Sequence, residues 1–168
     1  GTDRALITTP MYYNYSLMPL LFMWNVGGRS VFLPPHSPLF ADDLWRYIDR
    51  KKITFWPTIP TYFKNMLSRN DAWHKGIKYI IFSGEKLDAT EIDSFVTTFP
   101  GKHLYKVYGM SETCIIAATE LKKGMNPLEV GKPTLPSIRI KIKKKEICVQ
   151  SPLLLNRYVN KQSALDNE

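Results

Sequence analysis

Cysteine is scarce in this sequence, and no spacing of cysteine and histidine suits a metal. The 168 residues include two cysteines, Cys114 and Cys148, and both lie in apolar, strand-like segments. We expect buried, reduced thiols rather than a disulfide, as is typical of a cytoplasmic protein. The histidines His36, His74 and His103 lie far apart in predicted loops, so they indicate neither a zinc site nor a catalytic cluster.

Long hydrophobic runs and an N-terminal signal peptide are also missing. The most apolar stretch, Leu17–Val26, is shorter than the roughly 20 residues that a membrane-spanning helix needs, and it contains Pro19. We therefore expect no membrane span, and we assign this stretch to a buried helix of the core.

Two common catalytic motifs are absent. The sequence contains no glycine-rich loop with a lysine of the kind that cradles phosphates, which excludes a complete ATP site of that type. Ser83 lacks the glycine two residues before it that a hydrolase nucleophile elbow requires.

Basic residues are in excess, with a formal net charge of +8. They are scattered apart from the run Lys141–Lys145, which we interpret as an exposed strand face and turn rather than a nucleic-acid patch. The excess of cations is also consistent with a missing acidic neighbour.

What the sequence does contain is an alternation of strand and helix signals from Ala5 to Val107. Ile77–Phe82 is a near-continuous apolar run, Asp88 and Glu91 form a capping box, and Leu104–Val107 is a second apolar strand. This β-α-β crossover predicts an α/β fold whose sheet is mostly parallel, with helices on both faces.

A different pattern follows, so we divide the chain into two parts. Residues 1–120 form the predicted α/β subdomain, and residues 121–168 form the ribbon segment of a following β subdomain. Alternating isoleucines on either side of Lys143–Lys145 predict a C-terminal β-hairpin. Residues 160–168 have the composition of a cut or frayed end.

Two glycine-bearing turns are the candidate site. Ser83-Gly84-Glu85 and Gly109–Glu112 each follow a predicted parallel strand, so both open on the same edge of the sheet, where ligands of open α/β sheets bind. Gly109 lets the backbone turn sharply and approach a ligand. Tyr108 offers a stacking face, Ser111 a phosphate hydrogen bond and Glu112 a ligand for a hard cation. Each also has a structural explanation: a rim aromatic, a helix cap, an exposed carboxylate and, for Glu85, a helix start.

The segment Tyr108–Thr113 resembles the Y-G-x-[ST]-E motif of the adenylate-forming (AMP-binding) enzymes, which include acyl- and aryl-CoA synthetases, luciferases and adenylation domains of nonribosomal peptide synthetases. Other segments resemble further motifs of the family in the same order, and the match covers nearly the whole chain. They are Pro10–Tyr13, Val31–Pro60, Ser83–Leu87, Val130–Pro133 and Glu146–Val149.

The resemblance implies a ligase that joins a small carboxylate to ATP, releases pyrophosphate and passes the acyl group to a thiol of CoA or phosphopantetheine. In that scheme Ser111 and Glu112 are catalytic, and Glu112 ligates Mg²⁺. The nucleotide, ATP or AMP, would meet the two turns, and the acid would meet Tyr13 and Gly109. The nucleotide-binding residues are Ser83, Gly84, Glu85, Lys86, Tyr108, Gly109, Met110 and Ser111.

The sequence also departs from the family pattern. Tyr13 stands where many members carry histidine, and Lys145, Ser151 and Arg157 replace glycines, so those loops are expected to be reshaped. The family's phosphate loop lies upstream of this chain, and its ribose-binding aspartate and C-terminal domain lie downstream. We therefore expect an internal fragment that is inactive alone.

The sequence is also compatible with two other functions. One is a non-catalytic nucleotide-binding or regulatory module of the same fold, and the other is a basic nucleic-acid-binding domain. The sequence does not identify the carboxylic acid substrate, because Gly84-Glu85 favours amino-acid-activating relatives whereas Met110–Thr113 favours acyl- or aryl-CoA ligases.

Overall fold

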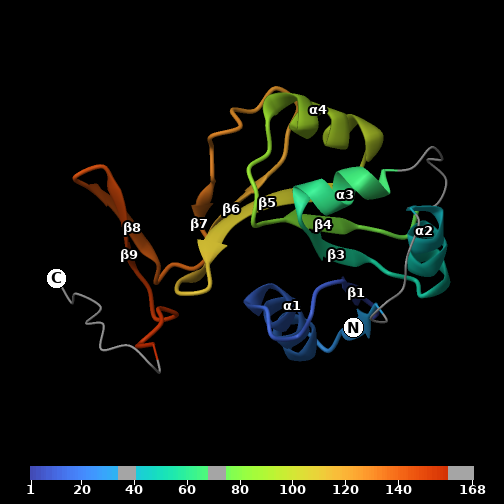
Figure 1. The fold of residues 1–168 in the computed structure, drawn as a ribbon, viewed down its shortest axis with the longest axis horizontal. Helices are drawn as coiled ribbons and strands as arrows, with labels where there is room; N and C mark the ends of the chain where they lie inside the picture. Colours follow the sequence, from blue (N-terminus) through green and yellow to red (C-terminus); the bar gives the residue numbers. More distant parts are fainter. Residues whose placement is uncertain (34–40, 68–74, 159–168) are drawn as a thin grey trace.

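A mostly parallel seven-stranded sheet forms the body of the protein (Figure 1). The computed structural model describes residues 1–33, 41–67 and 75–158. The strand order is β2-β1-β3-β4-β5-β6-β7; β1 to β5 are parallel, and β6 and β7 add antiparallel. The strands are β1 (Arg4–Ile7), β2 (Arg29–Phe32), β3 (Phe55–Thr58), β4 (Tyr79–Phe82), β5 (His103–Met110), β6 (Cys114–Glu120) and β7 (Lys132–Pro133). The predicted α/β fold is confirmed.

Some predictions need correction or lie outside these ranges. His103 begins β5, so its placement in a loop was wrong. His36, His74 and the predicted frayed end from residue 160 lie outside the described residues. The predicted division at residue 120 stays a prediction; β7, which follows it in sequence, still pairs with β6 in the main sheet.

The helices of the described residues begin and end at local signals in the sequence. They are α1 (Asn14–Asn25), α2 (Ala41–Arg50), α3 (Pro60–Met66) and α4 (Ala89–Thr98). The predicted capping box of α4 is present, because Asp88 Oδ1 accepts from Glu91 N at 2.7 Å and Glu91 Oε2 accepts from Asp88 N at 3.0 Å. α3 starts with Pro60, where a missing N–H does no harm.

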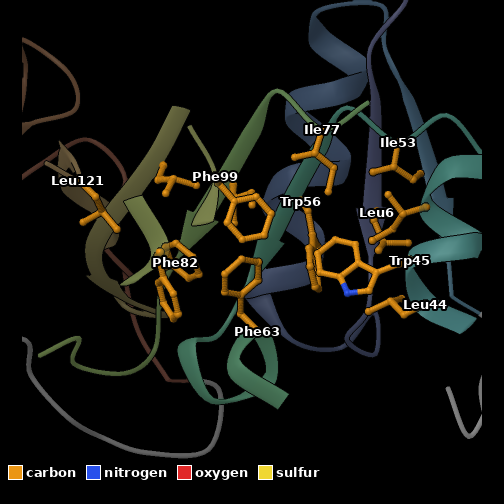
Figure 2. Close-up of a cluster of buried hydrophobic side chains, with 14 of the residues drawn as sticks. Leu6, Leu44, Trp45, Ile53, Trp56, Phe63, Ile77, Phe82, Phe99 and Leu121 are labelled. Atoms are coloured by element: carbon orange, nitrogen blue, oxygen red, sulfur yellow. The ribbon is translucent and has the colours of Figure 1, made fainter. Parts of the chain in front are cut away.

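One face of the sheet is closed by α2, α3 and α4 over an aromatic core. Trp56 of β3, Phe63 of α3 and Phe82 of β4 are fully buried there with Phe95 of α4 and Phe99 (Figure 2). Phe63 and Phe95 meet edge to face with centroids 4.9 Å apart, Trp56 and Phe63 are tilted at 5.4 Å, and Phe82 and Phe95 are stacked at 5.1 Å. These side chains come from the apolar strands and the helical stripe that the sequence predicted.

The other face carries α1, and this helix is far less buried than predicted (Figure 1). Its buried residues are Ser16, Pro19 and Met23, whereas Phe22 is 55% exposed and Trp24 is 79% exposed. The assignment of Leu17–Val26 to a fully buried core helix was therefore wrong. A continuous apolar run has no amphipathic periodicity, so the sequence pattern did not show which side of the helix would be covered.

A proline weakens the pairing in the middle of the sheet. β1 and β3 pair only at Ala5↔Phe55, whereas β3 and β4 pair over four positions. Pro57 has no N–H and cannot donate a ladder bond beyond Phe55. The carboxyl end of β3 therefore depends on β4 and on side-chain contacts from α1.

A separate two-stranded hairpin, β8 (Arg139–Lys143) and β9 (Glu146–Gln150), lies apart from the main sheet (Figure 1). This confirms the predicted hairpin. Its two turn residues, Lys144 and Lys145, have φ of 50° and 67°, as in a type I′ turn, although neither is glycine. The replacement of a family glycine by Lys145 thus falls on a left-handed residue.

The structure tests the predictions made for the two cysteines and for a membrane span. Both thiols are free as expected, but Cys148 is exposed and Cys114 is partly buried, so the expected burial was wrong. Among residues 1–33, 41–67 and 75–158, no helix combines the length and apolar character needed to cross a membrane.

Candidate functional site

A cavity of about 760 Å³ lies between α1 and the open face of the sheet. Its floor consists of two rows of side chains that the parallel register places next to each other. Phe55 pairs with Tyr79 in one row, and Pro57, Ile81 and Tyr105 form the other. The α1 side supplies Tyr13, Asn14, Met18 and Phe22.

Tyr15 ties α1 to this floor. Its hydroxyl lies 2.7 Å from the Thr58 carbonyl oxygen and 3.0 Å from the Ile81 carbonyl oxygen. The single hydroxyl proton is therefore shared between acceptors at the ends of β3 and β4. Burial raises the pKa of Tyr15, so the phenol stays protonated and remains a donor. A second tie joins Ser16 Oγ to the Thr9 carbonyl oxygen at 2.8 Å.

One end of the cavity is bordered by both predicted turns. Ser83 and Gly84 follow β4, and Gly109, Met110 and Ser111 belong to the end of β5 and its turn. The two turns open on one edge because β4 and β5 are parallel neighbours. The structure thus places five of the predicted site residues next to one cavity. Tyr13, predicted on the acid side, borders it as well.

Gly109 is required for a different reason than the sequence suggested. β5 continues to Met110, so Gly109 lies inside the strand, at a shift in register against β6. A Cβ at this position would lie 1.9 Å from the Cys114 carbonyl oxygen. Glycine is needed here because the neighbouring strand approaches closely, not because the chain turns sharply.

The sharp turn comes two residues later and carries Ser111 and Glu112. The loop Ser111–Thr113 joins β5 to β6, and Cys114 takes the left-handed conformation with φ of 55°. Thr113 fixes the loop, because its Oγ1 accepts from Met110 N at 3.2 Å and donates to the Cys114 carbonyl oxygen at 3.1 Å.

Glu112 is held by the segment that follows β9. The Tyr158 hydroxyl donates to Glu112 Oε1 at 2.7 Å, and the Leu155 N–H donates to the Glu112 carbonyl oxygen at 2.7 Å. The bond from Tyr158 holds the pKa of Glu112 below its ordinary value, so the carboxylate is the stable form.

The remaining predicted residues lie outside the cavity. By strand alternation Tyr108 shares the helix-covered side of β5 with Leu104 and Lys106, so its predicted stacking face lies outside the cavity. The aromatic surface of the cavity floor comes from Tyr79 and Tyr105 instead. Glu85 and Lys86 are exposed in the turn after β4.

Glu85 has a structural partner. Its Oε2 accepts from the Thr61 N–H at 2.8 Å, in the first turn of α3. The carboxylate therefore satisfies an unpaired donor of this helix terminus and fastens the β4 turn to α3.

The acidic residues could bind a metal ion only if a nucleotide supplied further ligands. Over the described parts of the chain no group of three or more His, Cys, Asp or Glu side chains converges on one point. Glu112 can thus offer a single carboxylate. Magnesium is commonly bound by one or two carboxylates together with substrate phosphates and water, so a single carboxylate such as Glu112 could hold it only together with such phosphates.

Sequence reasoning missed the cavity floor, Tyr15 and Tyr158. The floor had a signal, because alternate residues of adjacent parallel strands share a face, and Phe55, Tyr79 and Tyr105 occupy such positions. Tyr15 and Tyr158 had none, since their partners lie more than 40 residues away in sequence.

Comparison with known proteins gives a consistent family. The model of the AMP-binding enzymes matches residues 1–159. The long-chain-fatty-acid–CoA ligase of Bacillus subtilis (strain 168) is 25% identical over 177 residues, covering 96% of this chain and 31% of the ligase. The chloroplastic/peroxisomal 2-succinylbenzoate–CoA ligase of Arabidopsis thaliana is 26% identical over 117 residues, covering 67% of this chain and 20% of the ligase.

The fold is shared with solved structures. The o-succinylbenzoate–CoA synthetase of Bacillus subtilis, in complex with ATP and magnesium ion, superimposes with a TM-score of 0.77 at 24% identity, covering 95% of this chain and 35% of that chain. At this identity the likeness shows the fold alone. The chain spans between 20% and 31% of the length of the two curated ligases it matches.

Proposed function

Because the chain belongs to the AMP-binding enzyme family, we propose that the full-length protein carrying it is an ATP-dependent ligase that activates a carboxylic acid as an acyl-adenylate. One observation carries this proposal: the turns after β4 and β5 meet at one sheet edge and border an apolar cavity. An acid in the cavity would therefore present its carboxylate next to Ser111 and close to Glu112.

The proposed reaction has two steps. A carboxylate oxygen attacks the α-phosphorus of ATP, and pyrophosphate leaves with the electron pair of the broken P–O bond. The thiolate of CoA or of a carrier-protein pantetheine then attacks the acyl carbon, and AMP leaves. Both steps depend on holding the two reactants in line and on stabilising phosphate charge.

The residues divide between the two substrates. Tyr13 and Gly109 border the space for the acid. We assign the Ser111 hydroxyl to a phosphate oxygen and the Glu112 carboxylate to the magnesium ion, which when bound neutralises negative charge on the phosphates.

The nucleotide side is assigned to residues beyond the cavity. Tyr108 is half-buried on the side of the sheet away from the cavity, and we assign its ring to the adenine; Lys86 is exposed in the turn after β4. Glu85 supports this turn through Thr61, so its role is to shape the adenine side rather than to donate a charge.

We expect the 168-residue chain alone to show no turnover. It contains no glycine-rich lysine loop for the ATP phosphates, and it spans between 20% and 31% of the ligases it matches. ATP–pyrophosphate exchange by the isolated chain would contradict this proposal.

The test of function is carboxylate-dependent ATP–pyrophosphate exchange by the full-length protein. We expect Glu112→Ala to lower the exchange rate by about a hundredfold or more, because a charged group that acts on the transferring phosphate is lost. Glu146→Ala is the matched control, since Glu146 is an exposed carboxylate of β9, and it should leave the rate unchanged.

Two outcomes would contradict these assignments. Wild-type exchange by Glu112→Ala would remove Glu112 from the metal role. ATP binding with no exchange for any carboxylate would refute the ligase and favour a non-catalytic nucleotide-binding module.

A further inference from the structure

We propose that the cavity between α1 and the sheet takes the acyl part of a neutral, apolar carboxylic acid and discriminates against α-amino acids and dicarboxylic acids. The inference rests on the proposed function, because it names the substrate class of that same site. It follows from the charges, the polar groups and the extent of the cavity wall.

The wall is dominated by rings and aliphatic groups. Phe22 and Phe55 meet edge to face with their centroids 6.1 Å apart, and Met18 and Ile81 add aliphatic surface. The rings that border the cavity are Tyr13, Tyr15, Phe22, Phe55, Tyr79 and Tyr105. Such a surface stabilises a ligand by removing its apolar area from water, and it offers flat faces to aryl groups.

The wall offers no cation for a second carboxylate. In residues 1–33, 41–67 and 75–158, the side chains that line the cavity include no Lys, Arg or His. A dicarboxylic acid would therefore lose the hydration of its second charge without gaining an ion pair, which is strongly unfavourable in an apolar site. This separates the present cavity from a site suited to a succinylbenzoate, which carries two carboxylates.

The wall also offers no unpaired anion for an ammonium group. Of the described residues that line it, Asp3 is the one acidic side chain, and its Oδ1 accepts from Lys78 Nζ at 2.9 Å. Asp3 lies just before β1, away from the turns after β4 and β5 where the reacting carboxylate belongs. An α-ammonium group lies one carbon from the carboxylate, so it could not reach Asp3 from that end.

Two polar side chains of the wall, Tyr15 and Thr9, are committed to the fold. The Tyr15 hydroxyl is used by the Thr58 and Ile81 carbonyl oxygens, and Thr9 is hydrogen-bonded to Ser16. They fix the cavity instead of serving a polar substrate tail.

The extent of the cavity indicates an elongated acid. The lining runs from Tyr13 before α1 to Val26 after it, and α1 has 12 residues. A helix of this length spans about 18 Å. The volume of about 760 Å³ exceeds what a small acid such as acetate needs and is within the usual range for sites of larger ligands.

Three acids that share the 3-phenylpropanoate skeleton test the inference in the full-length protein. They are 3-phenylpropanoate, L-phenylalanine, which adds an ammonium group, and 3-(4-carboxyphenyl)propanoate, which adds a second carboxylate at the far end of the ring. We expect kcat/KM in pyrophosphate exchange to be about a hundredfold higher for 3-phenylpropanoate than for either charged analogue, since unpaired charge in the cavity is rejected strongly. Equal or better use of an analogue would overturn the inference.

A charge placed on the wall should change this preference. Phe22 lines the cavity and is 55% exposed, so Phe22→Lys is expected to fold and to supply the missing cation. We expect the ratio of kcat/KM for 3-(4-carboxyphenyl)propanoate over 3-phenylpropanoate to rise about tenfold. Trp24→Lys is the matched control, because Trp24 belongs to the same helix, is 79% exposed and does not line the cavity. An unchanged ratio in a folded Phe22→Lys protein would overturn the inference.

Equilibrium binding measured calorimetrically without ATP separates the inference from the proposed function. Binding of 3-phenylpropanoate without any exchange would refute the ligase and support the cavity assignment. Exchange with phenylalanine or 3-(4-carboxyphenyl)propanoate in preference to 3-phenylpropanoate would support the ligase and refute the cavity assignment. Failure to bind any of the three acids would refute the cavity assignment as well.

Discussion

The two faces of the sheet both carry apolar side chains but are covered very differently. On the face of α2, α3 and α4, the side chains of Phe63 and Phe95 are almost fully buried. On the face of α1, Phe22 and Trp24 remain more than half exposed, and a cavity separates the helix from the strands. The first face is a close-packed core, and the second is a surface with room for a ligand.

The difference shows how stability and binding are divided in this fold. Truncating a side chain in a packed core lowers the free energy of unfolding, because the surrounding residues do not refill the resulting cavity. On the α1 face this sensitivity is confined to the smaller buried cluster of Ala5, Ile7, Met23 and Phe55, and side chains that only border the cavity are less sensitive. This face must instead be held open by specific contacts, and Tyr15 is the clearest of these.

The largest effect is expected on the closed face. Phe63→Ala should destabilise the chain by about 3–5 kcal/mol, because Phe63 is fully buried among other rings. Phe22→Ala on the open face should cost less than about 1 kcal/mol, since its ring is 55% exposed. Urea unfolding followed by circular dichroism measures both. Equal losses would mean that the two faces do not differ as described.

The tie between α1 and the strands should give the next effect. Tyr15→Phe removes one donor and leaves the Thr58 and Ile81 carbonyl oxygens without it, so we expect a loss of about 1–2 kcal/mol in the same assay. Tyr12→Phe is the control, because Tyr12 is 81% exposed and lies two residues before the same helix. A neutral Tyr15→Phe would show that the open face needs no such tie.

A substitution that touches neither face gives a baseline for the comparison. Lys145→Gly should stabilise the hairpin by about 1 kcal/mol, because glycine adopts the left-handed conformation without strain. Lys143→Gly, in the adjoining strand β8, should instead destabilise by about 0.5–1 kcal/mol. Thermal unfolding of the two variants is the measurement, and the same sign for both would contradict the turn assignment.

The smallest effect concerns the ion pair at the Asp3 end of the cavity. The hydrogen bond from Lys78 holds the pKa of Asp3 below its ordinary value of 3.8. A lowered pKa in the folded state stabilises the fold above pH 3.8, and this contribution is lost as the pH falls through the lower, folded-state value. The pair is half exposed, so we expect less than about 1 kcal/mol.

Unfolding at about pH 6 and about pH 3 measures this contribution. Asp3→Asn should lose stability at the higher pH and little at the lower one. An equal loss at both values would show that charge is not the cause.

Most of the fold followed from local sequence signals. The capping box of Asp88 and Glu91, Pro60 at the start of α3 and the glycine after α1 are determined by neighbouring residues, so their positions could be predicted. The exposure of α1 could not be predicted, because it depends on what packs on the helix and not on the apolar content of its sequence.

The candidate site was predictable in its position but not in its contacts. Parallel strands place Ser83 and Ser111 on one edge, and that prediction needed only the crossover. The need for glycine at position 109 came from the approach of Cys114 in the next strand, and the partner of Glu85 came from α3. Such contacts form between segments that only the folded chain brings together.

The hydrogen bonds at Glu112 couple the loop between β5 and β6 energetically to the segment after β9. Tyr158 and Leu155 both bond to this residue, more than 40 positions earlier in the chain. A cation that draws Glu112 Oε1 away from the phenol must also supply the free energy to release it. By reciprocity, anything that fixes residues 155–158 in their present place changes the affinity of Glu112 for that cation by the same factor.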